Sequence, residues 1–347
     1  MTVGISINQG NRLESIVVTD SQVSSSGRQS NSVNKLGEFS AEKYHGVVFG
    51  SGNGNLIEGL IRTLGELKGE TLDEYITEIH SAHQTREDQA DRAYLDSQRK
   101  EIEKKASLML IEHKIKSITK NAEQFPEEQR EKFIHQQMMI AQQQYDQTVE
   151  QEIKMVIQKY NQVKQQNSTS FVIVAFDKEI NKIRQWHISQ SRYQELFMDH
   201  IEIGSGADGS NMYLATNLQG IHSETELNTA DLTFFALNAY NSSTINQGVG
   251  GRPKVIRVSK DGNTLLSGKQ INTLENLSGA YLSRFDEKRL SSRKTRNYMR
   301  DILSNKQHIY NFIADALELN VEALTTVGLP YSCWQERANQ KLFNGKK

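Results

Sequence analysis

The 347-residue chain has little of what marks several large classes of protein. Its single cysteine, Cys333, excludes an intrachain disulfide framework and is typical of a reducing compartment. No stretch approaches the roughly 18 apolar residues of a membrane span, and the first residues lack the charged and apolar regions of a signal peptide. A formal net charge of −1 gives no overall attraction to nucleic acid. We therefore expect a soluble cytoplasmic protein with neither a membrane nor a nucleic acid as its partner.

Metal and cofactor motifs are also absent from the sequence. The nine histidines show no ligand spacing with one another or with the cysteine. His80 and His83 are three residues apart, but no neighbouring pair completes a site. The glycine-rich stretch 204–209 has no lysine of the kind that a phosphate-binding loop uses. The sequence predicts no metal and no cofactor.

Glycine and proline almost disappear between residues 70 and 167, where Gln, Glu and Lys dominate. That composition is typical of long helices. Phe125-Pro126 predicts a reversal between two arms of about 40 residues, each roughly 60 Å long at 1.5 Å per residue. Apolar residues recur at steps of three and four on both sides of it, which predicts an antiparallel coiled-coil hairpin. They are Leu108, Ile111, Ile115 and Ile118 before the reversal, and Tyr145, Val149, Ile153, Val156, Tyr160 and Val163 after it.

Strand patterns lie on both sides of this helical segment. Residues 3–7 and 15–21 predict a β-hairpin that ends near Asp20, and residues 46–60 pass from a strand through a glycine-rich turn into a helix. Residues 169–177 are nearly all apolar, as expected of a strand whose sheet is covered on both faces. Further strands are expected at 182–188 and 200–203 and in a terminal hairpin of 253–258 and 263–266, and helices at 211–217 and 229–240.

Thr2 follows the initiator methionine directly. Removal of Met1 would leave a hydroxyl and a free α-amine on one residue. The amine titrates at about pKa 7.7–8.0 in model peptides, so it can accept the hydroxyl proton without a histidine. Thr2 is therefore a candidate nucleophile that carries its own general base.

The sequence resembles the proteasome β-subunit and HslV peptidase group of N-terminal-nucleophile hydrolases. The likeness lies in the order and spacing of Thr2, Asp20, Lys35, the turn at 50–54 and the stretch 203–207. The resemblance covers residues 2–67 and 168–267. It implies an α+β fold, a four-layer αββα sandwich with the helical hairpin as an elongation of its second helix.

The resulting division of the chain has four parts. Residues 1–69 and 168–273 form the two halves of the core, 70–167 the inserted hairpin, and 274–347 a C-terminal helical extension. The extension contains a basic stretch and a pattern faintly similar to a helix-turn-helix. An ordinary helical subdomain is favoured over DNA binding as the interpretation of these two features. The basic residues are Arg284, Lys288, Arg289, Arg293, Lys294, Arg296 and Arg300.

The resemblance also implies roles for individual residues. Lys35 would lower the pKa of the terminal amine, Asp20 would hold the lysine charged and oriented, and Ser205 would help to relay the proton. Gly50, at the strand-to-helix turn, is the expected backbone donor to the oxyanion. Asn246 stands where the family has an aspartate, so it can accept a hydrogen bond but carries no charge. For Asp20 and Lys35 the alternative is a surface ion pair.

The expected activity is therefore that of a threonine peptidase acting on peptides or proteins through an acyl-enzyme. We expect a homo-oligomer, a ring or a spiral, whose hairpin joins subunits or docks a partner such as an ATPase. Two alternatives stay open at this point. One is an amidase or peptide ligase that uses the same first half-reaction, and the other is an inactive scaffold that binds through the hairpin.

Overall fold

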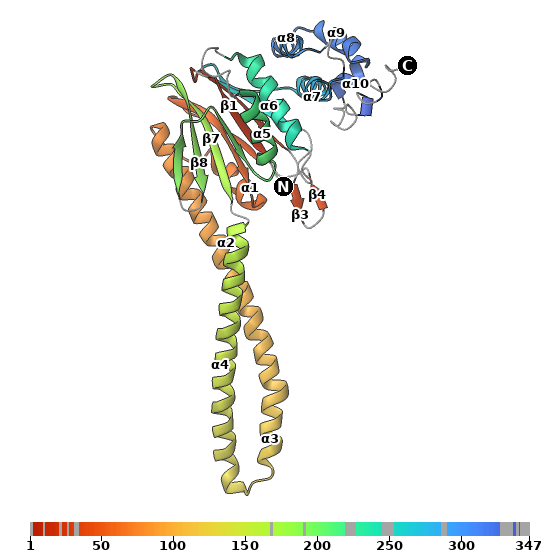
Figure 1. Cartoon of the computed structure of the whole chain (residues 1–347). Coiled ribbons are helices and arrows are strands. Elements are labelled where there is room, and N and C mark those ends of the chain that lie inside the picture. The colour runs from red at the N-terminus through yellow and green to blue at the C-terminus, as the bar shows by residue number, and fades with distance from the viewer. Residues whose placement is uncertain are drawn as a thin grey trace. The chain divides into compact units, whose positions relative to one another are not determined.

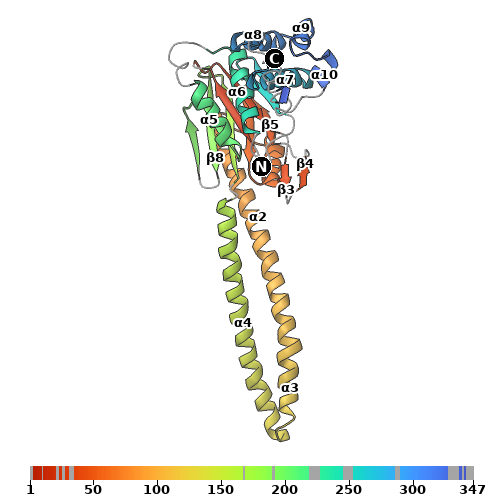
Figure 2. The same cartoon turned by 45° about the vertical axis from the view of Figure 1, so that its right-hand side comes forward.

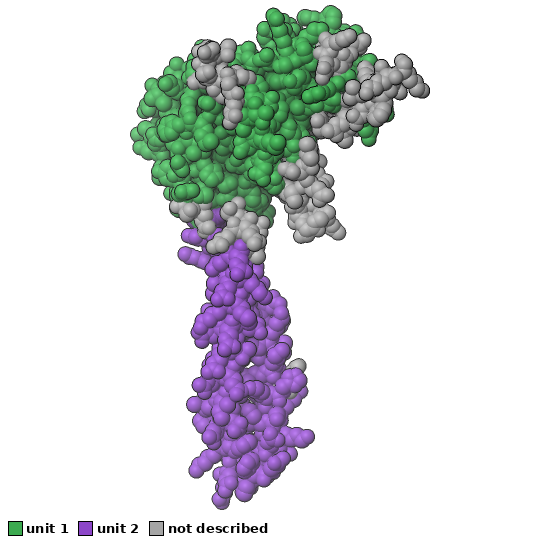
Figure 3. Space-filling model, viewed as in Figure 1, with its two compact units in different colours: residues 1–84, 169–347 green, residues 85–168 purple. Residues whose placement is uncertain are grey.

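The structure is a computed structural model, which describes residues 3–9, 11–20, 23–25, 28–30, 35–166, 169–189, 192–218, 227–244, 253–285, 290–326, 336–337 and 340. Thr2 and Asn246, two of the expected site residues, lie outside these ranges. The chain divides into two compact units (Figure 3). One contains residues 1–84 and 169–347, and the other contains residues 85–168.

The first unit contains two five-stranded antiparallel sheets (Figure 1). The first sheet has the order β10 (His200–Ile203), β1 (Gly4–Asn8), β2 (Glu14–Thr19), β11 (Lys254–Ser259), β12 (Gly262–Leu265). The second has the order β5 (Leu36–Ser40), β6 (Tyr44–Ser51), β7 (Ser170–Asp177), β8 (Lys182–Ser189), β9 (Tyr193–Leu196). The pair β3 (Val23–Ser25) and β4 (Arg28–Ser30) was not expected, because strands of three residues are too short to show an alternating pattern.

One hydrophobic cluster contains side chains from both sheets, with Val17 and Ile256 from the first and Phe49 and Val174 from the second. Gly4 on β1 is essential to this approach, because a Cβ at that position would come within 2.5 Å of the Phe49 ring. Side chains of the buried strand β7 contribute to this cluster on one face of the second sheet and to another cluster on the other face. The nearly all-apolar sequence of this strand predicted burial on both faces.

Polar groups also connect the two sheets. The Gln185 side-chain amide on β8 donates to Ser6 Oγ at 2.7 Å and to Asn8 Oδ1 at 2.9 Å, both on β1. His45 Nε2 on β6 lies 2.7 Å from the carbonyl oxygen of Ser259 on β11. Burial lowers the pKa of His45, so the imidazole is neutral near pH 7 and donates this bond from Nε2.

Helices cover the second sheet on the face away from the shared cluster. Buried residues of α1 (Gly54–Thr63) and of the first turns of α2 (Leu72–Met109) pack on β7 and β8. Tyr75, Ile76 and Ile79 of α2 are almost fully buried there. The division between the two compact units falls at 84/85, inside α2, and the start of this helix belongs to the first unit.

The helices of the C-terminal region share a core with the first sheet (Figure 2). α5 (Ala207–Leu218) and α6 (Thr229–Ser243) pack in one cluster with β1 and β2 and with α7 (Gly268–Leu282), α8 (Ser292–Leu303), α9 (Ile309–Ala316) and α10 (Val321–Thr326). Twelve of the 15 residues of α6 are buried. The region after residue 274 is thus integrated with the core.

The second unit is a helical hairpin. The rest of α2, the π-helical turn η1 (Leu110–Ile115) and α3 (Lys116–Ala122) form one arm, and α4 (Glu127–Gln166) forms the other. The arms are antiparallel, since the rings of Tyr94 and Tyr160 stack at 4.5 Å while Tyr145 Oη lies 3.4 Å from the Glu103 carbonyl oxygen. None of the described helices has the length and apolar character to cross a membrane.

The apolar stripe expected on the first arm is wrong at Leu108. Its side chain is 49% exposed, whereas Ile102 is buried. A single 3.6-residue period does not run from 108 to 118, because residues 110–115 are π-helical. On α4 the expected Val149 is buried, in agreement with the pattern.

Arg184 holds the start of α2 to the second sheet, and its replacement tests this connection. Its guanidinium bonds Asp73 at 2.8 Å and Glu195 at 2.8 Å, lies 3.3 Å from Asp177, and covers the Trp186 ring. Arg184→Met leaves these carboxylates without their cation, so we expect the free energy of unfolding to fall by about 2 kcal/mol or more. Urea unfolding followed by tryptophan fluorescence measures the change.

The matched control is Arg62→Met, because Arg62 is 75% exposed and its one ion-pair partner within the described ranges is Glu58 on its own helix. That variant is expected to lose less than about 0.5 kcal/mol. Equal losses in the two variants would contradict the role given to Arg184.

Candidate active site

A buried ion pair lies at one end of the first sheet. Asp20 directly follows β2 and Lys35 directly precedes β5, so the two residues come from different sheets. Lys35 Nζ donates to Asp20 Oδ1 at 2.9 Å, and the two side chains are 3% and 0% exposed. This burial excludes the surface ion pair that was the alternative interpretation of the two residues.

The same carboxylate is tied to the beginning of β1. The Val3 N–H donates to Asp20 Oδ1 at 3.3 Å, and the Asp20 N–H donates to the Val3 carbonyl oxygen at 3.1 Å. The pairing of β1 with β2, in which Gly4 lies opposite Thr19, produces this arrangement. The ion pair is therefore fixed beside the residue that immediately follows Thr2.

Burial dominates the electrostatics of the pair. It raises the pKa of Asp20 to about 6, although the positive charge of Lys35 and the bonds from Lys35 and Val3 act in the opposite direction. Burial likewise lowers the pKa of Lys35, although Asp20 opposes the change. Asp20 Oδ2 is buried and has no hydrogen-bond partner among the described residues, which adds to the cost of the charged form.

Gly50 lies near this pair, but its N–H already has an acceptor. It donates to the carbonyl oxygen of Lys35 at 3.1 Å, which extends the β5–β6 ladder by one bond. The expectation that Gly50 supplies the oxyanion donor therefore does not fit this geometry. The small size of Gly50 serves packing instead, because a Cβ there would lie 2.9 Å from the Phe171 ring.

Gly52 is a second glycine of this turn, which the sequence pattern alone did not single out. N–H groups two residues apart in a strand point to the same edge, so the Gly52 N–H follows that of Gly50 beyond the end of β5. No hydrogen-bond acceptor for it occurs among the described residues. Its φ of 108° requires glycine, and Asn53 after it caps α1. The string Gly-Ser-Gly-Asn-Gly contains both glycines, and the structure shows that β6 ends between them, at Ser51.

Ser205 lies two residues beyond the end of β10 and just before α5. β10 pairs with β1 so that Ile203 lies opposite Gly4, which brings the start of α5 to the same end of the sheet as Asp20. The structure therefore brings Asp20, Lys35, Ser205 and the 50–54 turn to one end of the first unit. Thr2 and Asn246 are not among the described residues.

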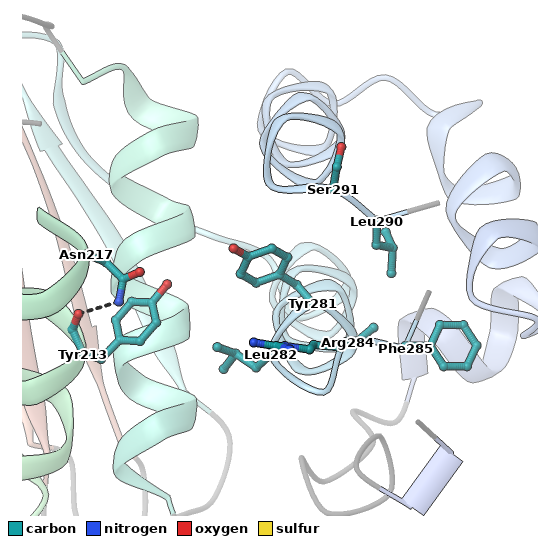
Figure 4. A pocket seen from close by; sticks show the side chains of 9 residues that line it. Tyr213, Asn217, Tyr281, Leu282, Arg284, Phe285, Leu290 and Ser291 are labelled. Atoms are coloured by element: carbon teal, nitrogen blue, oxygen red, sulfur yellow. Dashed lines mark hydrogen bonds between the residues drawn. The ribbon is translucent and has the colours of Figure 1, made fainter. Parts of the chain in front are cut away.

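A cavity of about 530 Å³ lies apart from the ion pair, between α5, α7 and the start of α8 (Figure 4). Tyr213, Asn217, Tyr281 and Arg284 line it, and its described lining residues include no carboxylate, histidine or lysine. These residues offer aromatic faces and one cation but no nucleophile with a base. No cluster of His, Cys, Asp and Glu among the residues that the structure describes could hold a metal ion.

Comparisons with known proteins give remote likenesses. No family model and no curated protein matches the chain. Anbu (ancestral beta-subunit) from Yersinia bercovieri is similar, with 11% identity, a TM-score of 0.45 and coverage of 76% of this chain and 87% of that one. An Anbu (Gly-1) mutant from Hyphomicrobium sp. strain MC1 is 9% identical, with a TM-score of 0.47 and coverage of 82% and 97%. At these values the likeness carries no residue roles over to this chain.

Removal of the lysine charge tests the electrostatics of the buried pair. In Lys35→Met the attraction that offsets burial is lost, so the pKa of Asp20 is expected to rise above about 6. In the unaltered protein the pKa of Asp20 is raised from its ordinary value of 3.8 to about 6, so folding favours the protonated carboxyl. This preference contributes about 3 kcal/mol to the free energy of unfolding. The contribution is fully present below pH 3.8 and is lost as the pH rises through 6. Carbon-13 NMR of labelled aspartate measures the titration.

Lys43→Met is the control, because Lys43 is exposed and pairs with Glu179 instead. It is expected to leave the titration of Asp20 unchanged. An Asp20 midpoint near pH 4 in the unaltered protein would show that Lys35 and Val3 offset the whole effect of burial and would contradict its dominance.

Proposed function

We propose that the chain is a proteasome-like N-terminal threonine peptidase that cleaves peptide bonds and has a four-layer αββα core. The buried Lys35–Asp20 pair, bonded to the residue after Thr2, is the observation that carries this proposal. Lys35 is a desolvated cation, and its partner Asp20 is bonded to the residue that follows Thr2. A positive charge there favours the neutral form of the Thr2 amine, which is the form that a general base needs.

The reaction begins when Met1 is removed. The amine of Thr2 accepts the hydroxyl proton as Thr2 Oγ attacks the scissile carbonyl, and Lys35 keeps the amine in its free-base form. The proton then passes to the leaving amine, and an ester links Thr2 to the acyl part of the substrate. A water molecule attacks this ester with the same amine as base, which releases the acid and restores the hydroxyl.

Backbone groups complete the proposed site. The Gly52 N–H, at the first turn before α1, is the proposed donor to the oxyanion, a role that commonly contributes about 3–4 kcal/mol to catalysis. Ser205, two residues beyond the end of β10, is proposed to relay a proton through its hydroxyl. Asn246 is proposed to orient the amine through its amide oxygen without adding charge.

An oligomer is the second part of the proposal. The edge strand β9 and the loop after it present exposed apolar side chains, with Tyr193 at 43%, Met198 at 57% and Phe197 at 75%. An exposed strand edge beside large apolar side chains is a surface that a second copy of the chain can cover. We propose that peptides or unfolded proteins are the substrates and that homo-oligomers restrict access to the site.

Probe labelling tests the chemistry. A β-lactone or epoxyketone probe is expected to form an adduct with the Met1-less chain, and intact-protein mass spectrometry will detect it. Thr2→Ala should abolish the adduct because it removes the nucleophile, and Lys35→Met should slow its formation at least about a hundredfold. Thr2→Ser, which keeps a hydroxyl and an amine, should retain labelling.

The variant Thr63→Ala controls for nonspecific labelling, because Thr63 Oγ1 donates to the Leu60 carbonyl oxygen within α1. Labelling that persists in Thr2→Ala would refute the assignment. Met1 that stays attached in the purified protein, as seen by N-terminal sequencing, would favour a binding scaffold over an enzyme.

Sedimentation tests the oligomer. The unaltered protein is expected to sediment at a multiple of its 39.4 kDa chain mass at micromolar concentration. Phe197→Glu places a charge on the proposed interface and should shift the distribution toward the monomer. The matched control Ile180→Glu alters another exposed apolar side chain, 54% exposed, between β7 and β8. A monomer without any substitution would refute this part of the proposal.

A further inference from the structure

A groove in the C-terminal region combines several cations with a single anion. It has a volume of about 210 Å³ and lies between α8 and the beginning of α6, in the same compact unit. Arg293, Arg296 and Arg300 from α8 line one side, and Asn228 and Asp231 line the other. None of these residues belongs to the proposed peptidase site.

The helical period gathers the arginines on one face. They are spaced by three and four residues, so their side chains follow one another along α8. Thr295, Met299 and Ile302 face the core and are fully buried. The arrangement of polar and apolar residues therefore fixes which side of α8 faces the groove.

The groove has an uncompensated positive charge. Arg296 Nη1 pairs with Asp231 Oδ1 at 3.0 Å, while Arg296 Nε is buried and has no hydrogen-bond partner in the described part of the chain. Arg293 and Arg300 have no carboxylate partner among the described residues. The described residues that line the groove, with three guanidinium groups and one carboxylate, carry a net charge of +2. Like charges held this close repel one another, and an anion in the groove relieves that repulsion.

The start of α6 adds to this potential. α6 has 15 residues, and its first turn lies at the groove, with Asn228 as its N-cap. The positive end of the helix dipole thus points toward the same space, although Asn228 itself accepts the N–H groups of Ala230 and Asp231.

We infer that this groove binds the phosphate group of a small phosphate-bearing ligand. A phosphate monoester carries nearly two negative charges at pH 7 and matches the net charge of the groove. Its three terminal oxygens suit the planar donor forks of arginine. The groove is smaller than the roughly 300 Å³ of an ordinary drug-sized site, so it accommodates the phosphate and leaves the rest of the ligand outside.

Calorimetric titration with inorganic phosphate and with phenyl phosphate tests the inference on the full-length protein. We expect one site per chain. Arg293→Gln and Arg300→Gln should each raise Kd at least about tenfold, because each removes a charged hydrogen-bond donor. Tighter binding of phenyl phosphate than of inorganic phosphate identifies an organic monoester as the ligand class, and equal binding identifies free phosphate.

Lys294→Gln is the matched control, because it removes one positive charge from the same helix but does not line the groove. It should change Kd by less than about twofold. Equal weakening in all three variants, or no saturable binding to the unaltered protein, would overturn the inference. Tighter binding of an oligonucleotide than of the monoester would also overturn it, since the surface would then recognise a polymer backbone. Circular dichroism confirms that each variant is folded.

Discussion

The close packing of the two sheets is the constraint on which the rest of the first unit depends. It requires a glycine at position 4, because any side chain there would collide with Phe49 of the opposite sheet. The same approach places Asp20, which follows a strand of one sheet, 2.9 Å from Lys35, which precedes a strand of the other. Buried polar bonds from Gln185 and His45 fix the sheets elsewhere. The candidate site is therefore a consequence of sheet packing.

This packing has an electrostatic cost at the candidate site. A carboxyl whose pKa is raised to about 6 and a lysine whose pKa is lowered are both less stable as charged groups than they would be in water. Perturbed pKa values of this kind cluster at functional sites, which is the reason for the role proposed for Lys35. The two hydrogen bonds between Val3 and Asp20 hold the pair beside the beginning of β1.

The hairpin and the C-terminal helices relate to the core in opposite ways. The hairpin forms a compact unit from residue 85 to residue 168, and its internal contacts join its own two arms. The helices after residue 268 instead bury α6 and form one cluster with the first sheet, and the side-chain amide of Asn276 bonds the Leu324 carbonyl at 3.1 Å. Both regions are helical in sequence, but only the C-terminal one has an apolar face that the core needs.

The sequence by itself determined the order of most strands and helices, though not β3, β4 and β9, together with the reversal after Phe125 and the residue types of the candidate site. These depend on local periodicity and on the positions of proline, glycine and polar residues, all of which can be read along the chain. Only the tertiary structure decided that Asp20 and Lys35 are buried together, that Leu108 is exposed, and that the N–H of Gly50 is already bonded. Burial, helix register and hydrogen-bond acceptors come from segments far apart in sequence, so local patterns carry no information about them.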